Sequence, residues 1–455
     1  MNDSLSEYYR CPEKYARVEL EGPFSGDSGY FTFGEDAVCY GGLSGRYPAR
    51  SPKGKLHDAL ADAKLHEGRV SVPFDPARIA DNLRFERYSL AGNSHSVASQ
   101  VVRKSYYFVR PLLPVKVRKH LQKAHLNGWD RLSFPHWPVD TTVDTLFERL
   151  LILNMRAQGL ERIPFIWFWP DGASSCAVMT HDVETTLGRD FSSTLMDIND
   201  SFGIKASFQV VPEKRYEVPE SYLESLRERE FEINVQDLNH DGRLYSDRET
   251  FMERVGKINQ YGREYRADGF RAAVLYRQQD WYDQFEFAYD MSVPNVAHLD
   301  PQRGGCCTVM PYFVGKLLEL PVTMTQDYPL FHILNEYSLD LWKRQADLIM
   351  QKHGFMNFIV HPDYITTARE RAIYEALLDY MVELRNKKDV WIPIPGDVNR
   401  WWRQRAAMKL VEDATGWHIA GEGAERARVA YASEKDGRMT YTLTGAAEPA
   451  VASSR

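Results

Sequence analysis

The sequence predicts an α/β fold built around a barrel of parallel strands. From about residue 174, apolar strand-like segments alternate with amphipathic helical segments, which is typical of parallel strands joined by crossover helices. Seven or so such units fall within about 225 residues, and that density favours a TIM-like barrel over an open sheet. A chain of 455 residues is longer than this barrel needs, so we also expect an N-terminal α+β extension and a small C-terminal β segment.

The barrel elements follow one another in a regular order. The expected strands are, in chain order, CAVMTHDVE, IKASFQVVP, FEINVQDLNH, GFRAAVLY, YDMSVPN, LLELPVTMTQD, FMNFIVHPDY and VWIPIPG. The expected helices are TLMDINDSFG, PESYLESLRERE, DRETFMERVGKINQYGRE, SLDLWKRQADLIMQKHG and ARERAIYEALLDYMVELRNK. In such a barrel the chemistry lies where the strands end, at the carboxyl-terminal face.

Two less regular regions flank the barrel. We divide the chain into an N-terminal accessory region of mixed α/β at 1–165, the barrel at 166–402 and a small β-rich tail at 403–455, whose end we expect to be disordered. Near 115–125 the accessory region contains a basic amphipathic helix, VKVRKHLQKAH. We expect it to pack on the next domain as a solvated helix, and peripheral contact with a membrane is the alternative.

Composition excludes several classes of function. A net charge of -7 argues against nucleic-acid binding, because an acidic surface repels phosphate. The first residues lack an apolar stretch flanked by basic residues, so we expect no secretory signal, and no apolar run approaches the roughly 20 residues that span a bilayer. The five cysteines lack metal-finger spacing. This favours reduced thiols and a cytoplasmic location.

Polar and charged residues gather where the predicted strands end. They are His181, Asp182 and Glu184 on the first strand, Gln236, Asp237 and His240 on the third, Arg271 on the fourth, Asp290 and Asn295 on the fifth, and His361 and Asp363 on a late strand. A hydrolytic metal site needs this mixture: carboxylates and imidazoles hold the metal, a carboxylate takes a proton from water, and a second histidine protonates the leaving group.

The motifs that carry these residues resemble the polysaccharide deacetylases, the NodB-homology enzymes of carbohydrate esterase family four. The motifs are, in order, THDVE, EINVQDLNHDG, GFRAAVLYR and FIVHPDYI. The resemblance covers about 174 to 395, roughly half of the chain. It implies a distorted (β/α)7 barrel and a metal-dependent hydrolase of carbon–nitrogen bonds.

The same resemblance implies a role for each residue of the motifs. Asp182 matches the catalytic base, Arg271 the residue that orients the base, and His361 the general acid. Glu184, Gln236 and His240 match the ligands of a divalent metal, with zinc as the expected ion. As substrate-binding residues we expect His181, Asp237, Asn295 and Tyr276.

Gln236 departs from the family pattern, which has histidine at this position. An amide oxygen is a poorer zinc ligand than imidazole. Three alternatives follow. The site binds metal through Glu184, His240 and a weak Gln236 oxygen; it recruits another ligand such as His181 or Asp237; or it has lost catalysis and binds carbohydrate.

The function expected from the sequence is N-deacetylation of a sugar in a surface polysaccharide or lipid-linked saccharide. The partner is therefore a carbohydrate substrate. An inactive barrel that binds carbohydrate, and a related hydrolase of other non-peptide carbon–nitrogen bonds, are the alternatives. The long loop HLDPQRGGCCTVMPY is expected to contact the substrate.

Overall fold

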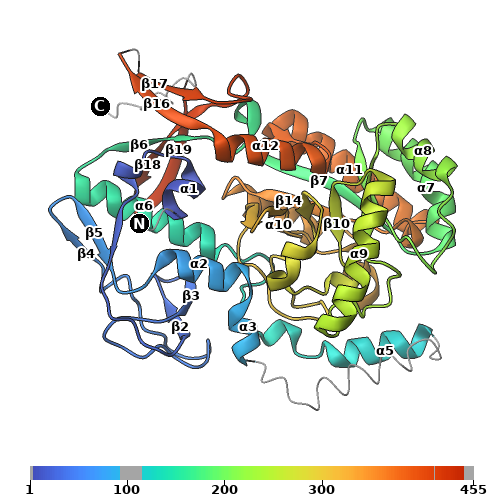
Figure 1. The fold of residues 1–455 in the computed structure, drawn as a ribbon, viewed down its shortest axis with the longest axis horizontal. Helices are drawn as coiled ribbons and strands as arrows, with labels where there is room; N and C mark the ends of the chain where they lie inside the picture. The colour runs from blue at the N-terminus through green and yellow to red at the C-terminus, as the bar shows by residue number, and fades with distance from the viewer. Residues whose placement is uncertain (1–3, 93–114, 415, 445–455) are drawn as a thin grey trace.

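A curled sheet of nine strands forms the centre of the chain (Figure 1). The computed structural model describes residues 4–92, 115–414 and 416–444. Eight strands follow one another in the order β12 (Tyr312–Val314), β13 (Leu317–Glu319), β11 (Tyr289–Asp290), β10 (Gly269–Arg271), β9 (Glu232–Gln236), β8 (Ala206–Val210), β7 (Ser175–Val183) and β14 (Phe355–Ile359), and β15 (Val390–Trp391) pairs with β7. All these pairs are parallel except β12 with β13. The α/β class is therefore as expected.

The helices that connect these strands alternate with them only in part. They are α7 (Thr186–Ser201), α8 (Glu220–Glu228), α9 (Arg248–Tyr265), α10 (Asp340–Met350), α11 (Ala368–Lys388) and α12 (Pro395–Ala407). Between β10 and β11 the chain forms only two 3-10 turns, η5 (Ala273–Leu275) and η6 (Gln279–Gln284), and β12 and β13 form a hairpin. The regular alternation that we expected stops here, because the stretch between β10 and β11 lacks a helical apolar period and the connection from β11 to β13 is interrupted by Pro and Gly.

A side chain links the two ends of the curled sheet. Beyond β13 the chain makes a parallel bridge between Val322 and Pro294. The hydroxyl of the next residue, Thr323, donates to the Phe355 carbonyl at 2.7 Å and accepts from the Asn357 amide at 3.0 Å. This segment therefore lies beside β14 and brings the residues after it to the carboxyl-terminal rim.

Alternate residues of β7 face opposite sides of the sheet, as the geometry of a strand requires. Ala177 and Met179 belong to the hydrophobic cluster that the sheet forms with its helices. Cys176 and Val178 belong to a second cluster, which also contains residues of β11, β13 and the N-terminal region. By this alternation Asp182 shares the second face and His181 the helix-covered face.

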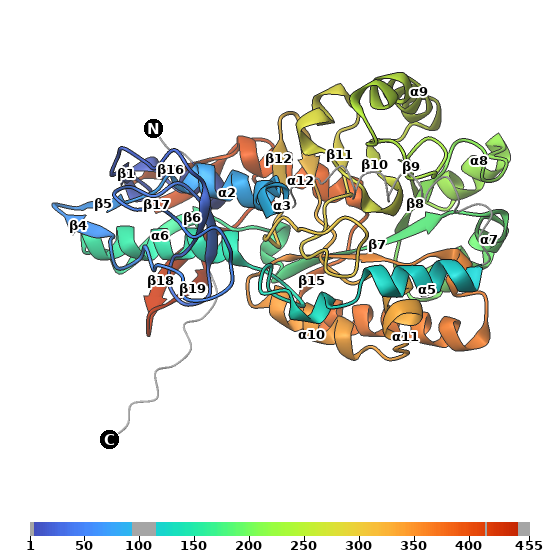
Figure 2. The same cartoon turned by 90° about the horizontal axis from the view of Figure 1, so that it is seen from below.

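The N-terminal region and the tail pack together at one end of the barrel (Figure 2). The helices of the N-terminal region are α1 (Ser4–Tyr9), α2 (Pro76–Arg84), α3 (Arg87–Gly92), α5 (Val115–His125) and α6 (Thr142–Gln158), of which α5 lies apart, along the barrel (Figure 1). The strands are β1 (Val18–Leu20), β2 (Gly29–Thr32), β3 (Val38–Gly41), β4 (Lys64–His66), β5 (Arg69–Val72), β6 (Arg162–Ile166), β16 (Lys409–Asp413), β17 (Gly416–Ala420), β18 (Val429–Lys435) and β19 (Arg438–Leu443). Strand β18 pairs with both β19 and β6, so the tail shares a sheet with the segment that leads into the barrel.

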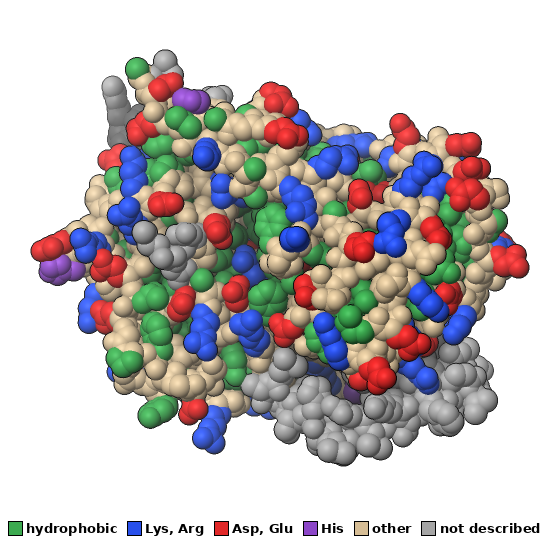
Figure 3. Space-filling view, in the orientation of Figure 1, with side chains coloured by type: hydrophobic (Ala, Val, Ile, Leu, Met, Phe, Trp, Pro, Cys, Tyr) green, Lys and Arg blue, Asp and Glu red, His purple; other side chains and the backbone are tan. Residues whose placement is uncertain are grey.

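The basic helix expected near 115–125 is α5, and it lies along the barrel (Figures 1 and 2). Its Gln122 accepts a hydrogen bond from Tyr328, at 2.5 Å, beside the short helix η7 (Pro329–Leu334). Among the described residues, no helix is long and apolar enough to cross a bilayer. Acidic and basic side chains are interspersed over the face seen in Figure 3. The tail end expected to be disordered lies outside the described residues.

Candidate active site

A buried ion pair lies at the end of β7. Arg271, the last residue of β10, donates from Nη1 to Asp182 Oδ1 at 2.5 Å and to Thr180 Oγ1 at 2.8 Å. Its Nε donates to the Met291 carbonyl at 3.0 Å. Arg271 is fully buried and Asp182 is 3% exposed. Because burying a charge is costly unless it is paired, the two side chains hold each other in place.

The second oxygen of Asp182 is also occupied. Gln236 ends β9 and donates from Nε2 to Asp182 Oδ2 at 3.1 Å. The strand register places Gln236 beside Arg271, so both donors reach Asp182 from neighbouring strands. Gln236 Oε1 is buried and has no hydrogen-bond partner among the described residues. Its amide is therefore directed at the carboxylate of Asp182.

A second charged group, Glu184, lies two residues after Asp182 in the chain. Glu184 Oε1 is 2.8 Å from His240 Nε2 and 3.5 Å from His361 Nε2. The closer contact is an ion pair when the His240 imidazole is protonated. Burial alone would raise the pKa of Glu184, but His240 and His361 outweigh it and hold that pKa well below its usual value.

His361 is fixed by a carboxylate on its other side. It follows β14, and its Nδ1 is 2.6 Å from Asp327 Oδ1, while its backbone amide donates to Asp327 Oδ2 at 2.8 Å. Burial alone would lower the pKa of His361, but Asp327 and Glu184 outweigh it and raise the pKa well above its usual value. The raised pKa favours the imidazolium form of His361, whose Nε2 lies on the side of Glu184.

Asp363 positions the backbone that carries Glu184. Its carboxylate accepts a hydrogen bond from the Glu184 backbone amide at 3.4 Å and another from the hydroxyl of Thr185. Thr185 is the N-cap residue of α7. A side chain at Gly188 would meet this carboxylate at 2.4 Å, so the close approach requires glycine there.

Residues that we expected to bind substrate lie elsewhere. His181 is fully buried on the helix side of β7, where its Nδ1 contacts the Val360 carbonyl at 3.0 Å and its Nε2 the Asn199 amide at 3.0 Å. Strand alternation turns His181 away from Asp182, so its position does not favour the substrate-binding or metal-ligand role, which stays a prediction.

Asn295 and Tyr276 are also structural. The Asn295 amide donates to the Asp140 and Thr308 carbonyls at 2.7 and 2.8 Å, and its oxygen accepts from the Asp140 amide at 2.8 Å, so both of its donor hydrogens are used within the protein. Tyr276 is 6% exposed after η5, which leaves little ring surface for a ligand. Neither residue fits the substrate-binding role that we expected.

Asp237 leaves the strand in a left-handed conformation, with φ of 52°. One of its oxygens accepts from the Leu238 amide at 2.7 Å, and the other is buried without a hydrogen-bond partner among the described residues. Burial raises the pKa of this carboxyl. The buried carboxyl binds its own loop and makes no contact with Glu184 or His240 that would recruit it as a ligand, so its expected substrate-binding role is not supported.

These side chains do not fit a resident zinc held by three protein ligands, the usual number in a catalytic zinc site. In the part of the chain that the structure describes, no three His, Cys, Asp or Glu side chains are grouped to hold a metal. Glu184 and His240 are of the right type, but Gln236 directs its amide hydrogens at Asp182. We therefore assign no step of the reaction below to a metal.

Two residues of the site were not identified from the sequence. Asp327 ends the segment LLELPVTMTQD. The signal that could have identified it is a lone carboxylate after a strand-like run. Thr180 lies two residues before Asp182 on the same face of β7, so the period of a strand pointed to it.

Protonation of buried His181 gives the protein a measurable sensitivity to acid. Burial lowers its pKa to about 3, against about 6.5 in the unfolded chain. The unfolded state then binds more protons below pH 6.5, so stability is lost as pH falls, by about 2 kcal/mol between pH 7 and pH 5. Measured by urea unfolding, the free energy of unfolding of wild type should fall by about this much more than that of His181→Gln between pH 7 and pH 5. Equal losses would contradict the account, and His66→Asn, at an exposed histidine, is the control.

Comparisons with known proteins give a likeness of fold over half of the chain. No protein-family model and no curated protein matches the sequence. A solved structure described as a polysaccharide deacetylase from Mycobacterium smegmatis is similar with a TM-score of 0.42 and 19% identity, over 52% of this chain and 93% of that one. An allantoinase is similar with a TM-score of 0.40 and 13% identity, over 52% and 92% of the two chains.

A third solved structure is described as a polysaccharide deacetylase involved in O-antigen biosynthesis, from Bordetella bronchiseptica. Its TM-score is 0.33 and its identity 19%, over 51% of this chain and 86% of that one. These TM-scores are too low to carry an argument about chemistry. The function is therefore argued from the side chains of this chain.

Proposed function

We propose that this chain is an amide hydrolase that removes the acetyl group from an N-acetylated sugar of a surface polysaccharide or lipid-linked saccharide. One observation carries the proposal: a carboxylate held by a buried arginine and an imidazolium held by a buried carboxylate lie on the same rim. The first pair is Asp182 with Arg271, and the second is His361 with Asp327. A base and an acid of this kind are the two groups that hydrolysis of an amide requires.

The reaction follows from the charges of these groups. Asp182 accepts a proton from a water molecule, whose oxygen attacks the acetyl carbon. Arg271 holds Asp182 in place through its Nη1 hydrogen bond. As the carbon–nitrogen bond of the tetrahedral intermediate breaks, His361 gives its Nε2 proton to the leaving nitrogen. The products are acetate and the free amino sugar.

One buried atom provides a further contact for the substrate. Gln236 Oε1 lacks a hydrogen-bond partner among the described residues. A buried polar atom without a partner is costly, so a ligand that supplies a hydrogen bond recovers that cost on binding. Hydroxyl and amide hydrogens of an N-acetylated sugar are donors of this kind.

The proposal is tested by substituting the proposed acid, His361, rather than the proposed base, Asp182. Acetate release from an N-acetylglucosamine trimer should fall about a hundred- to ten-thousand-fold in His361→Asn, because no proton reaches the leaving nitrogen. His66→Asn is the matched control at an exposed site and should keep the wild-type rate. A panel that also holds a cyclic ureide shows whether another carbon–nitrogen bond is the true target. An unchanged rate in His361→Asn would overturn the proposed role.

A carbohydrate-binding protein without catalysis is the second candidate, and the environment of Asp182 favours it. Arg271 and Gln236 engage both oxygens of this carboxylate, so a water molecule would have to share an oxygen that already accepts a hydrogen bond. In this reading the barrel keeps its rim for binding and has lost the ligand that a histidine at position 236 would supply.

Restoring that ligand distinguishes the two candidates. Gln236→His should bind zinc about tenfold or more tightly than wild type, because imidazole joins Glu184 and His240 as a third ligand. Metal analysis of the purified variant measures this, and Gln236→His combined with Glu184→Gln should lose the gain. Acetate release by Gln236→His but not by wild type would show that the chain is an inactivated deacetylase. Acetate release by wild type would support the first candidate.

A further inference from the structure

Helix α5 concentrates positive charge in an acidic protein. Its 11 residues, VKVRKHLQKAH, include four Lys and Arg, two His and no Asp or Glu. The sequence around it is also basic, since residues 87–129 contain eight Lys and Arg and no Asp or Glu, although the whole chain has a net charge of -7. No step of the reaction proposed above uses this helix.

One side of α5 is open to solvent. His120, Lys123 and His125 are exposed, and Leu121 keeps 41% of its surface exposed among them. An exposed leucine among basic side chains is typical of a helix that lies on a lipid surface, because the cations meet the headgroups and the apolar side chain meets the acyl chains.

Other residues of this segment hold α5 on the barrel. Gln122 Oε1 accepts a hydrogen bond from the Tyr328 hydroxyl at 2.5 Å. The carbonyl of His125 accepts from Arg303 Nη2 at 3.4 Å, and Leu126, directly after the helix, is 1% exposed. The helix is therefore supported on the barrel while its basic side chains reach solvent.

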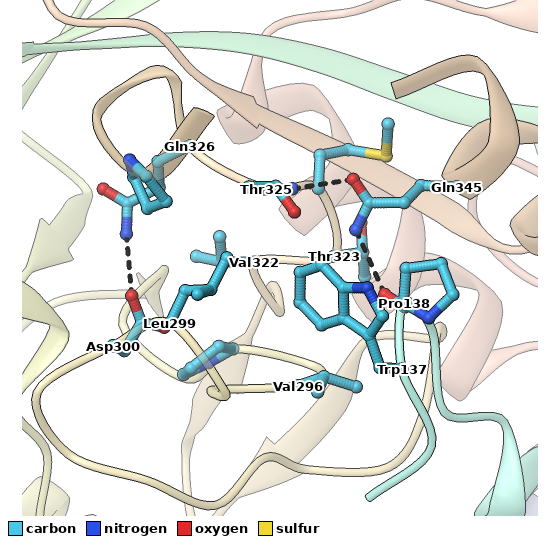
Figure 4. A pocket seen from close by; sticks show the side chains of 13 residues that line it. Trp137, Pro138, Val296, Leu299, Asp300, Val322, Thr323, Thr325, Gln326 and Gln345 are labelled. Atoms are coloured by element: carbon cyan, nitrogen blue, oxygen red, sulfur yellow. Dashed lines mark hydrogen bonds between the residues drawn. The ribbon is translucent and has the colours of Figure 1, made fainter. Parts of the chain in front are cut away.

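The chain after α5 is anchored to the barrel as well. The Trp129 ring meets the Trp137 ring edge-on, with centroids 5.0 Å apart. Gln345, on α10, donates to the Pro138 carbonyl at 3.1 Å and accepts from the Thr325 amide at 3.0 Å (Figure 4). Gln345 thus joins the segment that follows α5 to the barrel, which gives α5 a defined position beside it.

That position is close to the proposed acid. Tyr328, which binds Gln122, packs against Tyr364 with ring centroids 5.5 Å apart. Tyr364 in turn packs against the imidazole of His361, with centroids 4.9 Å apart. Two tyrosine rings therefore connect α5 to His361, and a surface that binds α5 lies near the candidate active site.

We propose that α5 binds an anionic lipid surface and that the saccharide substrate is attached to a lipid. The identity of the substrate rests on the proposed function, whereas the lipid contact does not. Anionic headgroups attract clusters of four or more Lys and Arg on an amphipathic helix. Binding through α5 brings His361 near the headgroups, where the sugar of a lipid-linked saccharide lies.

Sedimentation with vesicles tests the lipid contact without requiring turnover. The full chain is mixed with vesicles of phosphatidylcholine, or of phosphatidylcholine and phosphatidylglycerol in equal amounts. Wild type should sediment only with the anionic vesicles, and added salt should release it, because salt screens exposed charges. Lys119→Gln combined with Lys123→Gln should weaken binding about tenfold or more, since each Lys near an anionic surface contributes about fivefold in affinity.

Lys53→Gln combined with Lys55→Gln is the matched control, because it removes the same charge from two exposed positions outside α5. This control should bind the anionic vesicles as tightly as wild type. An equal loss of binding in the two double variants would overturn the assignment to α5. Tighter binding of wild type to single-stranded RNA than to anionic vesicles would overturn the lipid surface as the partner.

The outcomes separate this inference from the proposed function. Equal binding of wild type to both kinds of vesicle, or to neither, would overturn the lipid contact, even if wild type releases acetate. Vesicle binding that depends on the α5 lysines, without acetate release, would support the contact and reject the hydrolase.

The substrate is tested with an N-acetylglucosamine trimer that carries an acyl anchor. In anionic vesicles this anchored trimer should lose acetate faster than the free trimer, and the variant with Lys119→Gln and Lys123→Gln should lose that advantage. Equal rates for the anchored and the free trimer would overturn the preference for a lipid-linked saccharide.

Discussion

Asp182→Asn should lower acetate release about a hundred- to ten-thousand-fold, because the asparagine amide cannot accept the proton of water. The substitution keeps the shape of the side chain, so saccharide binding should be retained. The initial rate and the saccharide affinity are measured on the same preparation. A variant that keeps wild-type turnover would show that Asp182 is not the base.

The same substitution leaves a buried cation without its carboxylate. Arg271 is fully buried, and removing one partner of such a pair costs about 3–5 kcal/mol. Thermal unfolding of Asp182→Asn therefore accompanies the rate measurement, and rates are compared well below its transition. His361→Asn leaves this ion pair intact, so a fall in rate in both variants separates lost chemistry from lost stability.

Glu86→Gln should destabilise the protein by about 3–5 kcal/mol, because Arg277 stays buried but loses the carboxylate that pairs with it. Glu86, at the end of the α2 segment, accepts from Arg277 Nε at 2.7 Å and from the Gly305 amide at 2.6 Å. The two side chains are 5% and 3% exposed. This pair joins the N-terminal region to the barrel and to the long Gly-rich loop.

Urea unfolding measures the effect. Glu86→Leu combined with Arg277→Met should recover much of the loss, because replacing both charges removes the unpaired one. Glu19→Gln, in an exposed pair with Arg69, is the control and should cost less than about 1 kcal/mol. A loss below about 1 kcal/mol in Glu86→Gln would contradict the role assigned to this pair.

The strand ends of the barrel were predictable from the sequence. Apolar runs that stop near Asp182, Gln236 and Arg271 become parallel strands of one sheet. Gln236 and Arg271 are register partners on neighbouring strands, and both reach across β8 to Asp182 on β7. His361 follows from the same rule. The direction of His181 was predictable too, since adjacent residues of a strand face opposite sides of the sheet.

Other features depend on contacts between residues far apart in the chain. Asn295 resembles a site residue in sequence, yet its amide binds the backbone of Asp140, 155 residues away. The pairing of β6 with β18 and the burial of the long loop against Glu86 likewise arise from tertiary packing. Local patterns carry no information about such partners. Asp327, the partner of His361, is also distant from it in the sequence, so local patterns do not reveal the pair.

Acetate release by wild type tests the central claim most directly. The N-acetylglucosamine trimer is incubated with the full chain, once with added zinc and once with a chelator, and the products are followed by proton NMR. The account predicts acetate and free amino groups in equal amounts. Binding of the trimer with no acetate in either condition would contradict it and leave the carbohydrate-binding alternative.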